Sequence, residues 1–395
     1  MKTQTESLSI QLREVILSYM GTYGDRNMPV HSPEEFLFFD IETTGLSPRN
    51  SSVYLIGAAG YENGRQVLRQ WFAENLAEEE AILEAFLDFS RHFRHLIHFN
   101  GTTFDVPFLQ ARCRKYGLDC SFSRMEQTDI YRLVSPCKNL MKLSNCRQKS
   151  LEEFLGIHRE DPFTGGQLTE VYRSYREKPD EQLLRVLLLH NADDIRGMLS
   201  ILPVLAYPSL FSSAPHVRQA RLAPCRDAEG NSRKELLLYL SLSYSLPVPF
   251  SFNGNGCFFT GTEGQGILKV PVFTGELKHF YPDYKNYSYL PGEDNAIHKS
   301  VAVYVDKAHR LPATPETCYT RKSGDFLPLP PEPAKKRKEN AVSGSSFEPL
   351  FHLRAPSRNP AGERNDFFLP DEAFFRDPDR LSAYAARLLR SMLRS

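Results

Sequence analysis

The chain has 395 residues, which at roughly 100–200 residues per domain predicts two domains and a tail. Its 48 basic and 48 acidic side chains cancel, and 41% hydrophobic with 24% charged residues exclude collagen-like and wholly disordered classes. No unbroken apolar run approaches the ~18 residues of a membrane span, since Pro203 and Pro208 interrupt the best one, 201–210. The seven cysteines are an odd number without a C-x-x-C pair, and the first twenty residues lack the apolar core of a signal peptide. We therefore expect a cytoplasmic protein that has no membrane segment.

The first half of the chain alternates between helical and extended patterns. Residues 1–33 predict an N-terminal helix (5–20) and a polar lead-in. Strands are then expected at 36–41, 53–61, 65–72, 96–99 and 128–133, and helices at 76–93, 104–116, 149–156, 168–176 and 180–202. Asn63-Gly64 is a strong hairpin signal between the second and third strands. Residues 34–207 are thus predicted to form an α/β domain with a mixed sheet flanked by helices.

The second half reads as a smaller β-rich domain over 208–322. Short apolar runs separated by Gly and Pro are expected as strands at 236–244, 256–259, 266–273, 276–281, 286–290 and 300–305. Residues 323–395 are predicted to be a flexible linker rich in Pro, Ser and Lys, followed by a basic amphipathic helix at 379–394.

Two carboxylates end the first predicted strand of the α/β domain. Asp40 and Glu42, in FFDIETTGL, are two residues apart and share one face of a strand. They repel each other unless a cation lies between them, and Mg²⁺ or Mn²⁺ prefers such oxygen ligands. In the alternative interpretation Asp40 only ends the strand and Glu42 faces solvent.

Further acids follow other elements of the same domain. Asp105, in LIHFNGTTFDVPFL, comes at the first turn of a helix, where it could serve only as a cap. Asp194 lies four residues after His190 in LLLHNADDIRGM, so both share one helix face. Adjacent acids among apolar residues are unusual, because a buried carboxylate needs a partner. Asp193 remains the alternative to Asp194 as the inward-facing acid.

The order of these motifs resembles the DEDD-type 3′-5′ exonucleases of the RNase H-like superfamily. The segment TDIYRLVSPCKNLMKLSNCRQKSLEEFLGIHRED, followed by HNADD, is similar to the YprB-type RNase H-like proteins of bacteria. The resemblance covers roughly residues 34–205, and it implies an RNase H-like fold for them. The C-terminal half resembles no family that we can name.

The resemblance implies that four acids, Asp40, Glu42, Asp105 and Asp194, hold two Mg²⁺ or Mn²⁺ ions. It also implies that His190 acts as the general base or orients the attacking water, since histidine titrates near neutral pH. One departure stands out: the Tyr subclass places its aromatic residue four before the last Asp, whereas the His subclass places its His five before. His190 stands at the Tyr spacing, so it either acts in a hybrid role or only shapes the site.

Four residues beside the acids are candidates for nucleic-acid contacts. The backbone at Thr43 could approach a terminal nucleotide, and Leu46 and Phe104 could stack on the last base or belong to the core. Asn100 could bind a phosphate or the backbone at the strand end. The predicted partner is nucleic acid with single-stranded 3′ ends, either DNA or RNA. Protein partners are not predicted.

These features favour a metal-dependent 3′-5′ exonuclease that uses a two-metal mechanism. One alternative is a structure-specific endonuclease that uses the same site. The other is a nucleic-acid-binding protein without catalysis, in which the β-rich domain is the functional part.

Overall fold

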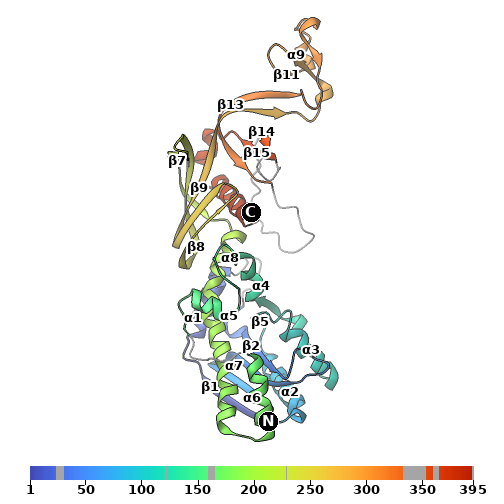
Figure 1. Cartoon of the computed structure of the whole chain (residues 1–395), viewed down its shortest axis with the longest axis vertical. Coiled ribbons are helices and arrows are strands. Elements are labelled where there is room, and N and C mark those ends of the chain that lie inside the picture. Colours follow the sequence, from blue (N-terminus) through green and yellow to red (C-terminus); the bar gives the residue numbers. More distant parts are fainter. Residues whose placement is uncertain are drawn as a thin grey trace. The chain divides into compact units, whose positions relative to one another are not determined.

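In a computed structural model of the chain, the strand that carries Asp40 and Glu42 lies inside a six-stranded sheet (Figure 1). The strand order is β1-β4-β3-β2-β5-β6. The six strands are β1 Lys2–Ser7, β2 Phe36–Thr43, β3 Val53–Glu62, β4 Arg65–Phe72, β5 His95–His98 and β6 Glu126–Asp129. The β2, β5 and β6 strands are parallel, and the other neighbours are antiparallel. The predicted mixed sheet is confirmed.

The structure describes residues 1–23, 31–120, 122–158, 165–227, 229–331, 353–358 and 364–393. They divide into two units. The first comprises Met1–Ser209 with Leu246–Val248, and the second comprises Leu210–Ser245 with Pro249–Ser395.

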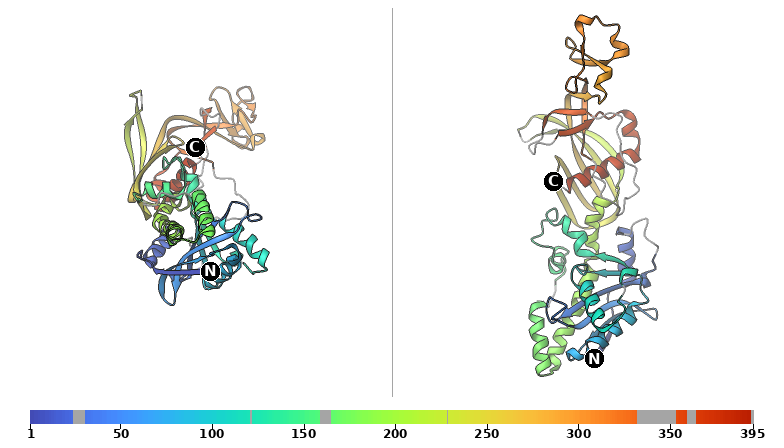
Figure 2. Two further views of the ribbon diagram at one scale, coloured as in Figure 1. Left: turned by 60° about the horizontal axis from the view of Figure 1, so that its bottom comes forward. Right: turned by 90° about the vertical axis from the view of Figure 1, so that its right-hand side faces the viewer.

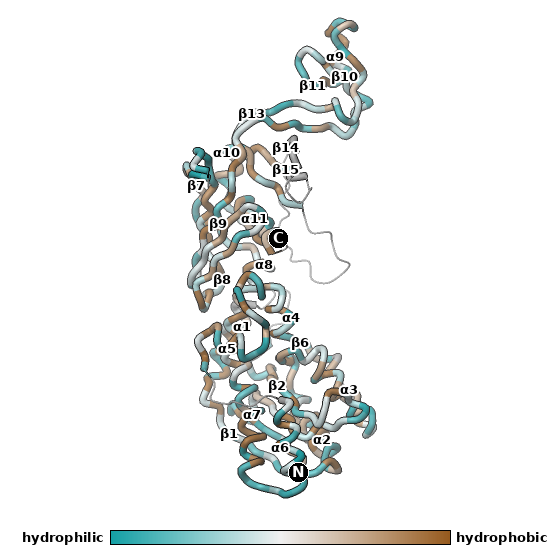
Figure 3. The backbone as a smooth tube through the Cα atoms, viewed as in Figure 1, coloured by the Kyte–Doolittle hydropathy of each residue, from teal (hydrophilic) through white to brown (hydrophobic). Residues whose placement is uncertain are grey.

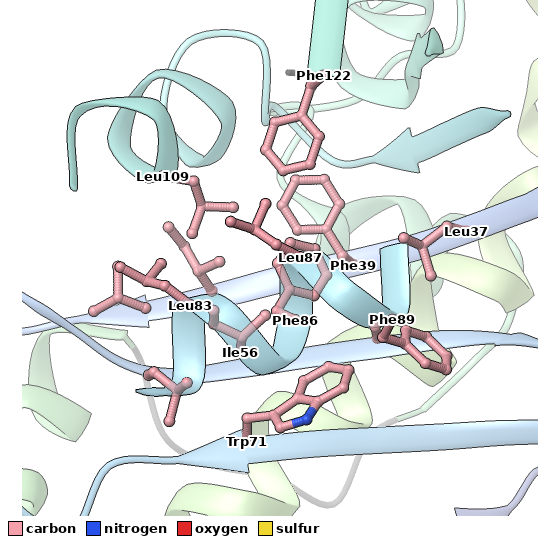
Figure 4. Packing of buried hydrophobic residues seen from close by; sticks show 14 of the residues in the cluster. Leu37, Phe39, Ile56, Trp71, Leu83, Phe86, Leu87, Phe89, Leu109 and Phe122 are labelled. Carbon is pink, nitrogen blue, oxygen red and sulfur yellow. The ribbon is translucent and has the colours of Figure 1, made fainter. Parts of the chain in front are cut away.

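Alternation along β2 decides which face of the sheet carries the acids. Leu37, Phe39 and Ile41 pack into a buried cluster with α2 (Glu79–Ser90) and α3 (Asp105–Tyr116), and part of this cluster is drawn in Figure 4. The intervening residues of β2 point to the opposite face, because successive strand residues alternate. Asp40 and Glu42 therefore share that opposite face, as predicted.

The long helix α7 (Glu181–Ile201) packs on the face of the sheet that carries the acids. It contacts β2 and β3, and together with α6 (Gly165–Glu177) it buries Tyr54 and Phe72. Asp180 caps α7, since its carboxylate accepts hydrogen bonds from the backbone N–H groups of residues 182 and 183. The remaining helices of this unit are α1 Leu12–Tyr23, α4 Ile130–Val134 and α5 Gln148–Phe154.

Apolar residues recur along α7 (Figure 3). Within the described residues, one helical stretch, Glu181–Ser212, is long and apolar enough to cross a membrane by length and composition alone. This criterion averages over scattered charged residues, so it differs from the sequence criterion, which asked for an unbroken apolar run and found none of that length. About 72% of its apolar window is buried inside the protein, as expected of a helix that packs on a sheet.

Several elements of the first unit differ from the sequence-based expectation. The region expected as a helix at 5–20 begins as the edge strand β1, which pairs with β4, and only α1 is helical. The strand expected at 128–133 ends at Asp129, whose side chain caps α4. The Asn63-Gly64 hairpin is confirmed, with both residues at positive φ.

The second unit is built on two long strands, β8 (Ser232–Gly254) and β9 (Cys257–Phe280), with α11 (Pro378–Met392) lying on their sheet (Figure 2). The strand order is β13-β15-β14-β9-β8-β7, and a small sheet β11-β10-β12 lies beyond the far end of β9 and β13. The other bounds are β7 His216–Arg226, β10 Tyr287–Leu290, β11 Asn295–His298, β12 Leu311–Pro312, β13 Tyr319–Leu329, β14 Leu353–Arg358, β15 Arg364–Phe368, α8 Ala206–Ser212, α9 Lys299–Ala302 and α10 Glu372–Arg376.

The separate β-rich region is confirmed, but its strands are longer than expected. Three expected runs merge into β9, because the strand continues through Gly264 and Gly275, which lie in the gaps between those runs. The run expected as a strand at 300–305 contains the short helix α9 instead. Residues 323–329 continue β13, where the start of a linker was expected. Most of the remaining expected linker, at 332–352, lies outside the described residues.

The first prediction concerns Gly57 of β3, which lies beneath α7. A Cβ atom at this position would lie 2.0 Å from Asn191 Oδ1 and 2.6 Å from Ile195 Cδ1. We expect Gly57→Ala to lower the free energy of unfolding by about 1–3 kcal/mol through overpacking. Urea unfolding followed by the fluorescence of Trp71, the single tryptophan, reports on this unit.

Gly21→Ala is the matched control, because among the described residues, its chain neighbours and its own helix backbone aside, no atom lies within 4 Å of the added methyl group. Gly21 lies in α1, so alanine there should leave stability unchanged or raise it by up to about 1 kcal/mol. Equal unfolding midpoints for Gly57→Ala and the unsubstituted protein would contradict the packing described.

Candidate metal and catalytic site

A chain of amide side chains holds the carboxylate of Asp40. The Asn191 amide donates to Asp40 Oδ2 at 3.1 Å, and its own Oδ1 accepts from Gln70 Nε2 at 2.9 Å. Gln70 also donates to the backbone carbonyl of Leu188 at 2.8 Å. Asn191 and Gln70 are both buried, so β4 and α7 fix the carboxylate at the end of β2.

The imidazole of His190 lies between two of the expected acids. Its Nε2 is 3.1 Å from Asp194 Oδ2 and 3.7 Å from Glu42 Oε1. Asp194 is one helical turn further along α7, and Glu42 is almost fully buried on β2. One donor atom from each of the three residues lies within 4.8 Å of the others, a separation that suits ligands of one cation.

Asp105 and Asp40 belong to the same cluster of negative charge. Burial raises the pKa of Asp105 to about 7, and the charges of Asp129 and Asp194 act in the same direction. Hydrogen bonds from its own backbone and from that of Ile41 oppose this shift. The pKa of Asp40 is also raised well above its ordinary value, by burial and then by the charges of Asp105, Asp194 and Glu42.

This donor set fits a divalent cation. Asp40, Glu42, Asp105 and Asp194 offer the hard oxygen ligands that Mg²⁺ and Mn²⁺ prefer. A bound cation would also relieve the mutual repulsion that raises the pKa values of Asp40 and Asp105.

The structure separates Asp193 from this cluster. Its carboxylate pairs with Arg196 at 2.8 Å, and Arg196 also pairs with Glu6 of β1. Asp194 is therefore the acid of the Asp-Asp pair that faces β2.

Thr43 and Leu46 belong to the loop that follows β2. The Thr43 hydroxyl donates to the carbonyl oxygen of Gly45 at 2.9 Å, so this side chain supports the turn. Leu46 is 86% exposed, which leaves its side chain open to a ligand.

A buried ion pair fixes the far end of the same loop. Arg112 of α3 pairs with Glu79 of α2, and both are almost fully buried. The guanidinium also donates to the carbonyl of Pro48 at 2.8 Å and to Ser52 Oγ at 3.2 Å. Leu46 is thus exposed on a loop that is anchored to the core.

Asn100 and Phe104 have partners within the protein. Asn100 adopts a positive φ of 60°, and its side-chain oxygen accepts a hydrogen bond from the Thr103 hydroxyl at 2.7 Å. The ring of Phe104 is partly buried, 5.4 Å from that of Phe108 between centroids. The structure therefore gives both side chains a local packing or turn-forming role next to Asp105.

Sequence analysis missed three residues around the acids. Asp129 accepts hydrogen bonds from the backbone N–H groups of Asn100 and Thr102, which fixes the turn before Asp105. Asn191 holds Asp40, as described above. The Tyr54 hydroxyl is buried without a hydrogen-bond partner among the described residues, and burial followed by the charge of Glu42 raises its pKa. Only Asp129 had a visible signal, since it is an acid within the predicted strand at 128–133.

Comparison with known proteins bears on the fold of this part of the chain. A family model described as the RNase H superfamily matches residues 37–206. Residues 37–206 form an RNase H-like domain. The resemblance inferred from the motifs is confirmed for this part of the chain, which is less than half of its length.

Two curated proteins match the same kind of region. The uncharacterized protein YprB of Bacillus subtilis is 25% identical over 175 residues, or 43% of this chain and 42% of that protein. A PolC-type DNA polymerase III of Caldanaerobacter subterraneus is 24% identical over 173 residues, or 36% of this chain and 12% of that protein. The chain thus matches less than half the length of either relative.

Similar solved structures include two nucleic-acid enzymes. A family B DNA polymerase of the archaeon Pyrobaculum calidifontis is 12% identical with a TM-score of 0.39, over 91% of this chain and 46% of that chain. Exonuclease I of E. coli, in complex with an oligonucleotide, is 12% identical with a TM-score of 0.30, over 52% of this chain and 54% of that chain.

The raised pKa of Asp105 generates a prediction for the metal-free protein. The pKa is about 7 in the folded state and near 3.8 when unfolded, so the folded state binds the proton more tightly. The free energy of unfolding should therefore fall as pH rises from about 4 to about 7. Urea unfolding across this range in EDTA measures the effect through Trp71 fluorescence.

Asp105→Asn should flatten this dependence, because the amide does not titrate. It should also make the metal-free protein more stable than the unsubstituted chain at pH 8. An unchanged pH dependence in the variant would contradict the assignment of the raised pKa to Asp105.

Proposed function

We propose that the RNase H-like domain is a metal-dependent nuclease, and that it removes nucleotides from 3′ ends of nucleic acid. The observation that carries the proposal is the convergence of Asp40, Glu42, Asp105 and Asp194 with His190 at one edge of the sheet. A group of carboxylates this crowded is costly without a cation. Phosphodiester hydrolysis explains the presence of this group, because bound cations neutralise the charge on the attacking and leaving oxygens.

The four acids are proposed to hold two Mg²⁺ or Mn²⁺ ions. When bound, such a pair supplies an activated water and stabilises the leaving 3′ oxygen. The amide of Asn191 keeps one oxygen of Asp40 in a fixed direction, and the backbone N–H of Ile41 does the same for Asp105. The protein's contribution is thus a set of ligands held in place before substrate binds.

His190 is proposed to accept the proton of the attacking water. Its Nε2 faces the acids, 3.1 Å from Asp194, although the residue stands at the spacing of the Tyr subclass. A histidine is suited to this role because its ordinary pKa lies near neutral pH.

The substrate is proposed to be a single-stranded 3′ end, of DNA or RNA. The RNase H-like family model and the relative named as a DNA polymerase support nucleic acid as the substrate class. Leu46 offers an exposed apolar side chain on the anchored loop four residues after Glu42, where a terminal base could stack.

The test uses single-stranded oligonucleotides labelled at the 5′ end, DNA and RNA in parallel, with Mn²⁺ or Mg²⁺. We expect products that shorten one nucleotide at a time and that disappear with EDTA. Asp194→Asn should reduce the rate by about 100-fold or more, because a metal site supplies several kcal/mol of charge stabilisation. Gel separation of timed samples measures both results.

Asp193→Asn is the matched control, since this adjacent acid pairs with Arg196 away from the cluster. It should retain activity within a few-fold of the unsubstituted chain. Discrete internal cuts would instead support the endonuclease alternative. Intact substrate that still binds would contradict catalysis and favour a binding protein.

A further inference from the structure

A second group of metal-ligand side chains lies at the opposite end of the parallel strands. His95 begins β5 and Glu126 begins β6, and the two are register partners. His31 lies in the segment that leads into β2, whose first residue, Phe36, pairs with His95. Asp40 follows Phe36 by four residues along β2. At ~3.3 Å per residue, it lies about 13 Å from Phe36 along the strand. This group is therefore separate from the carboxylate site.

Three buried polar atoms of this group face one another. They are His31 Nε2, His95 Nδ1 and Glu126 Oε2, and none has a hydrogen-bond partner among the described residues. Oε2 of Glu126 lies 3.3 Å from the His31 atom and 3.5 Å from the His95 atom. Buried polar atoms without partners are costly, so three that converge on one point indicate a missing ligand.

The opposite nitrogen of each imidazole faces a polar group that orients the ring. His31 Nδ1 lies 3.5 Å from the carboxylate of Glu35. His95 Nε2 lies 2.8 Å from the Thr128 hydroxyl, which is 2.7 Å from the hydroxyl of Tyr19. Such outer partners typically orient histidines that bind metals, and here they turn Nε2 of His31 and Nδ1 of His95 toward Glu126.

We propose that His31, His95 and Glu126 bind a Zn²⁺ ion. Two imidazole nitrogens and one carboxylate oxygen are a donor set that Zn²⁺ accepts, with water in a fourth position. Tetrahedral ligands at the usual Zn–N and Zn–O distances of ~2.0–2.1 Å lie about 3.3 Å apart. The separations of 3.3 and 3.5 Å around Glu126 are close to that spacing, and the three donor atoms all lie within 4.8 Å of one another.

The proposed ion has a structural role. It joins the segment before β2 with the first residues of β5 and β6. Among the described residues, no backbone pairing connects that segment directly with β6. Binding energy at this point stabilises the folded state relative to the unfolded chain. The ion would thereby hold the edge of the parallel strands whose other ends carry the acids.

The experiment measures Zn²⁺ binding by the full chain after EDTA treatment and buffer exchange. Zinc content by mass spectrometry and competition with a chromophoric chelator give stoichiometry and affinity. We expect one equivalent that stays tightly bound when Asp40 is replaced by Asn, and at least 100-fold weaker binding of this equivalent in Glu126→Gln and in His31→Gln. Glu35→Gln, which changes only an outer partner, should weaken binding by about 10–100-fold. Co²⁺ added in place of Zn²⁺ should give the visible absorption of a tetrahedral site, absent from His31→Gln.

Two controls separate this site from its surroundings. Glu34→Gln changes a neighbouring acid that pairs with Arg13 on the surface, and it should leave Zn²⁺ affinity unchanged. Asp40→Asn should also retain the zinc equivalent, which distinguishes this site from the carboxylate cluster. Circular dichroism of each variant confirms folding.

The proposal is overturned if the stripped chain binds Zn²⁺ no better than Glu126→Gln, in which case the group is only a histidine–carboxylate ion pair. It is equally overturned if zinc is lost in Asp40→Asn while Glu126→Gln keeps it. Neither result depends on nuclease activity, so the nuclease proposal stands or fails separately.

Discussion

Repulsion among carboxylates at the end of β2 is the constraint around which the RNase H-like domain is arranged. Asp40 and Glu42 share one face of the strand, and Asp105 and Asp194 approach from α3 and α7. Burial and the neighbouring negative charges raise the pKa values of Asp40 and Asp105, so keeping these carboxylates ionised together is unfavourable. A protein keeps such a costly group together when a cation, or chemistry that uses one, compensates for it.

Residues on neighbouring strands and helices hold the acids in place. Gln70 of β4 supports Asn191 of α7, which holds Asp40, and Gly57 of β3 leaves the space that Asn191 occupies. On the other face of the sheet, the Glu79–Arg112 pair anchors the loop after Glu42. The site therefore depends on long-range packing of the whole unit.

Local sequence patterns predicted most strands and helices of this unit, but few of the side-chain contacts between them. The three central strands, the Asn63-Gly64 hairpin and α7 follow from apolar runs, turn residues and an Asp cap, which are short-range signals. The positions of Asp40, Glu42, His190 and Asp194 follow from strand and helix periodicity. Asn191 and Tyr54 were missed because their roles arise only when β2, β3 and α7 pack together.

The second unit was less predictable for a related reason. Its glycines suggested chain breaks, yet β9 continues through Gly264 and Gly275 because neighbouring strands supply the pairing. Residues 5–7 of the edge strand β1 were likewise expected in a helix, since the pairing of β1 with β4 is not visible in six polar residues. Tertiary pairing overrode local preference in both cases.

Calorimetric titration of Mn²⁺ into the EDTA-treated full chain and into Asp40→Asn tests the central claim most directly. The account predicts saturable binding to the unsubstituted chain, weakened by about tenfold or more in the variant, because the charges of the other three acids all act on Asp40. Equal affinity and stoichiometry in the two proteins would show that the carboxylates do not form a metal site, and would contradict the account.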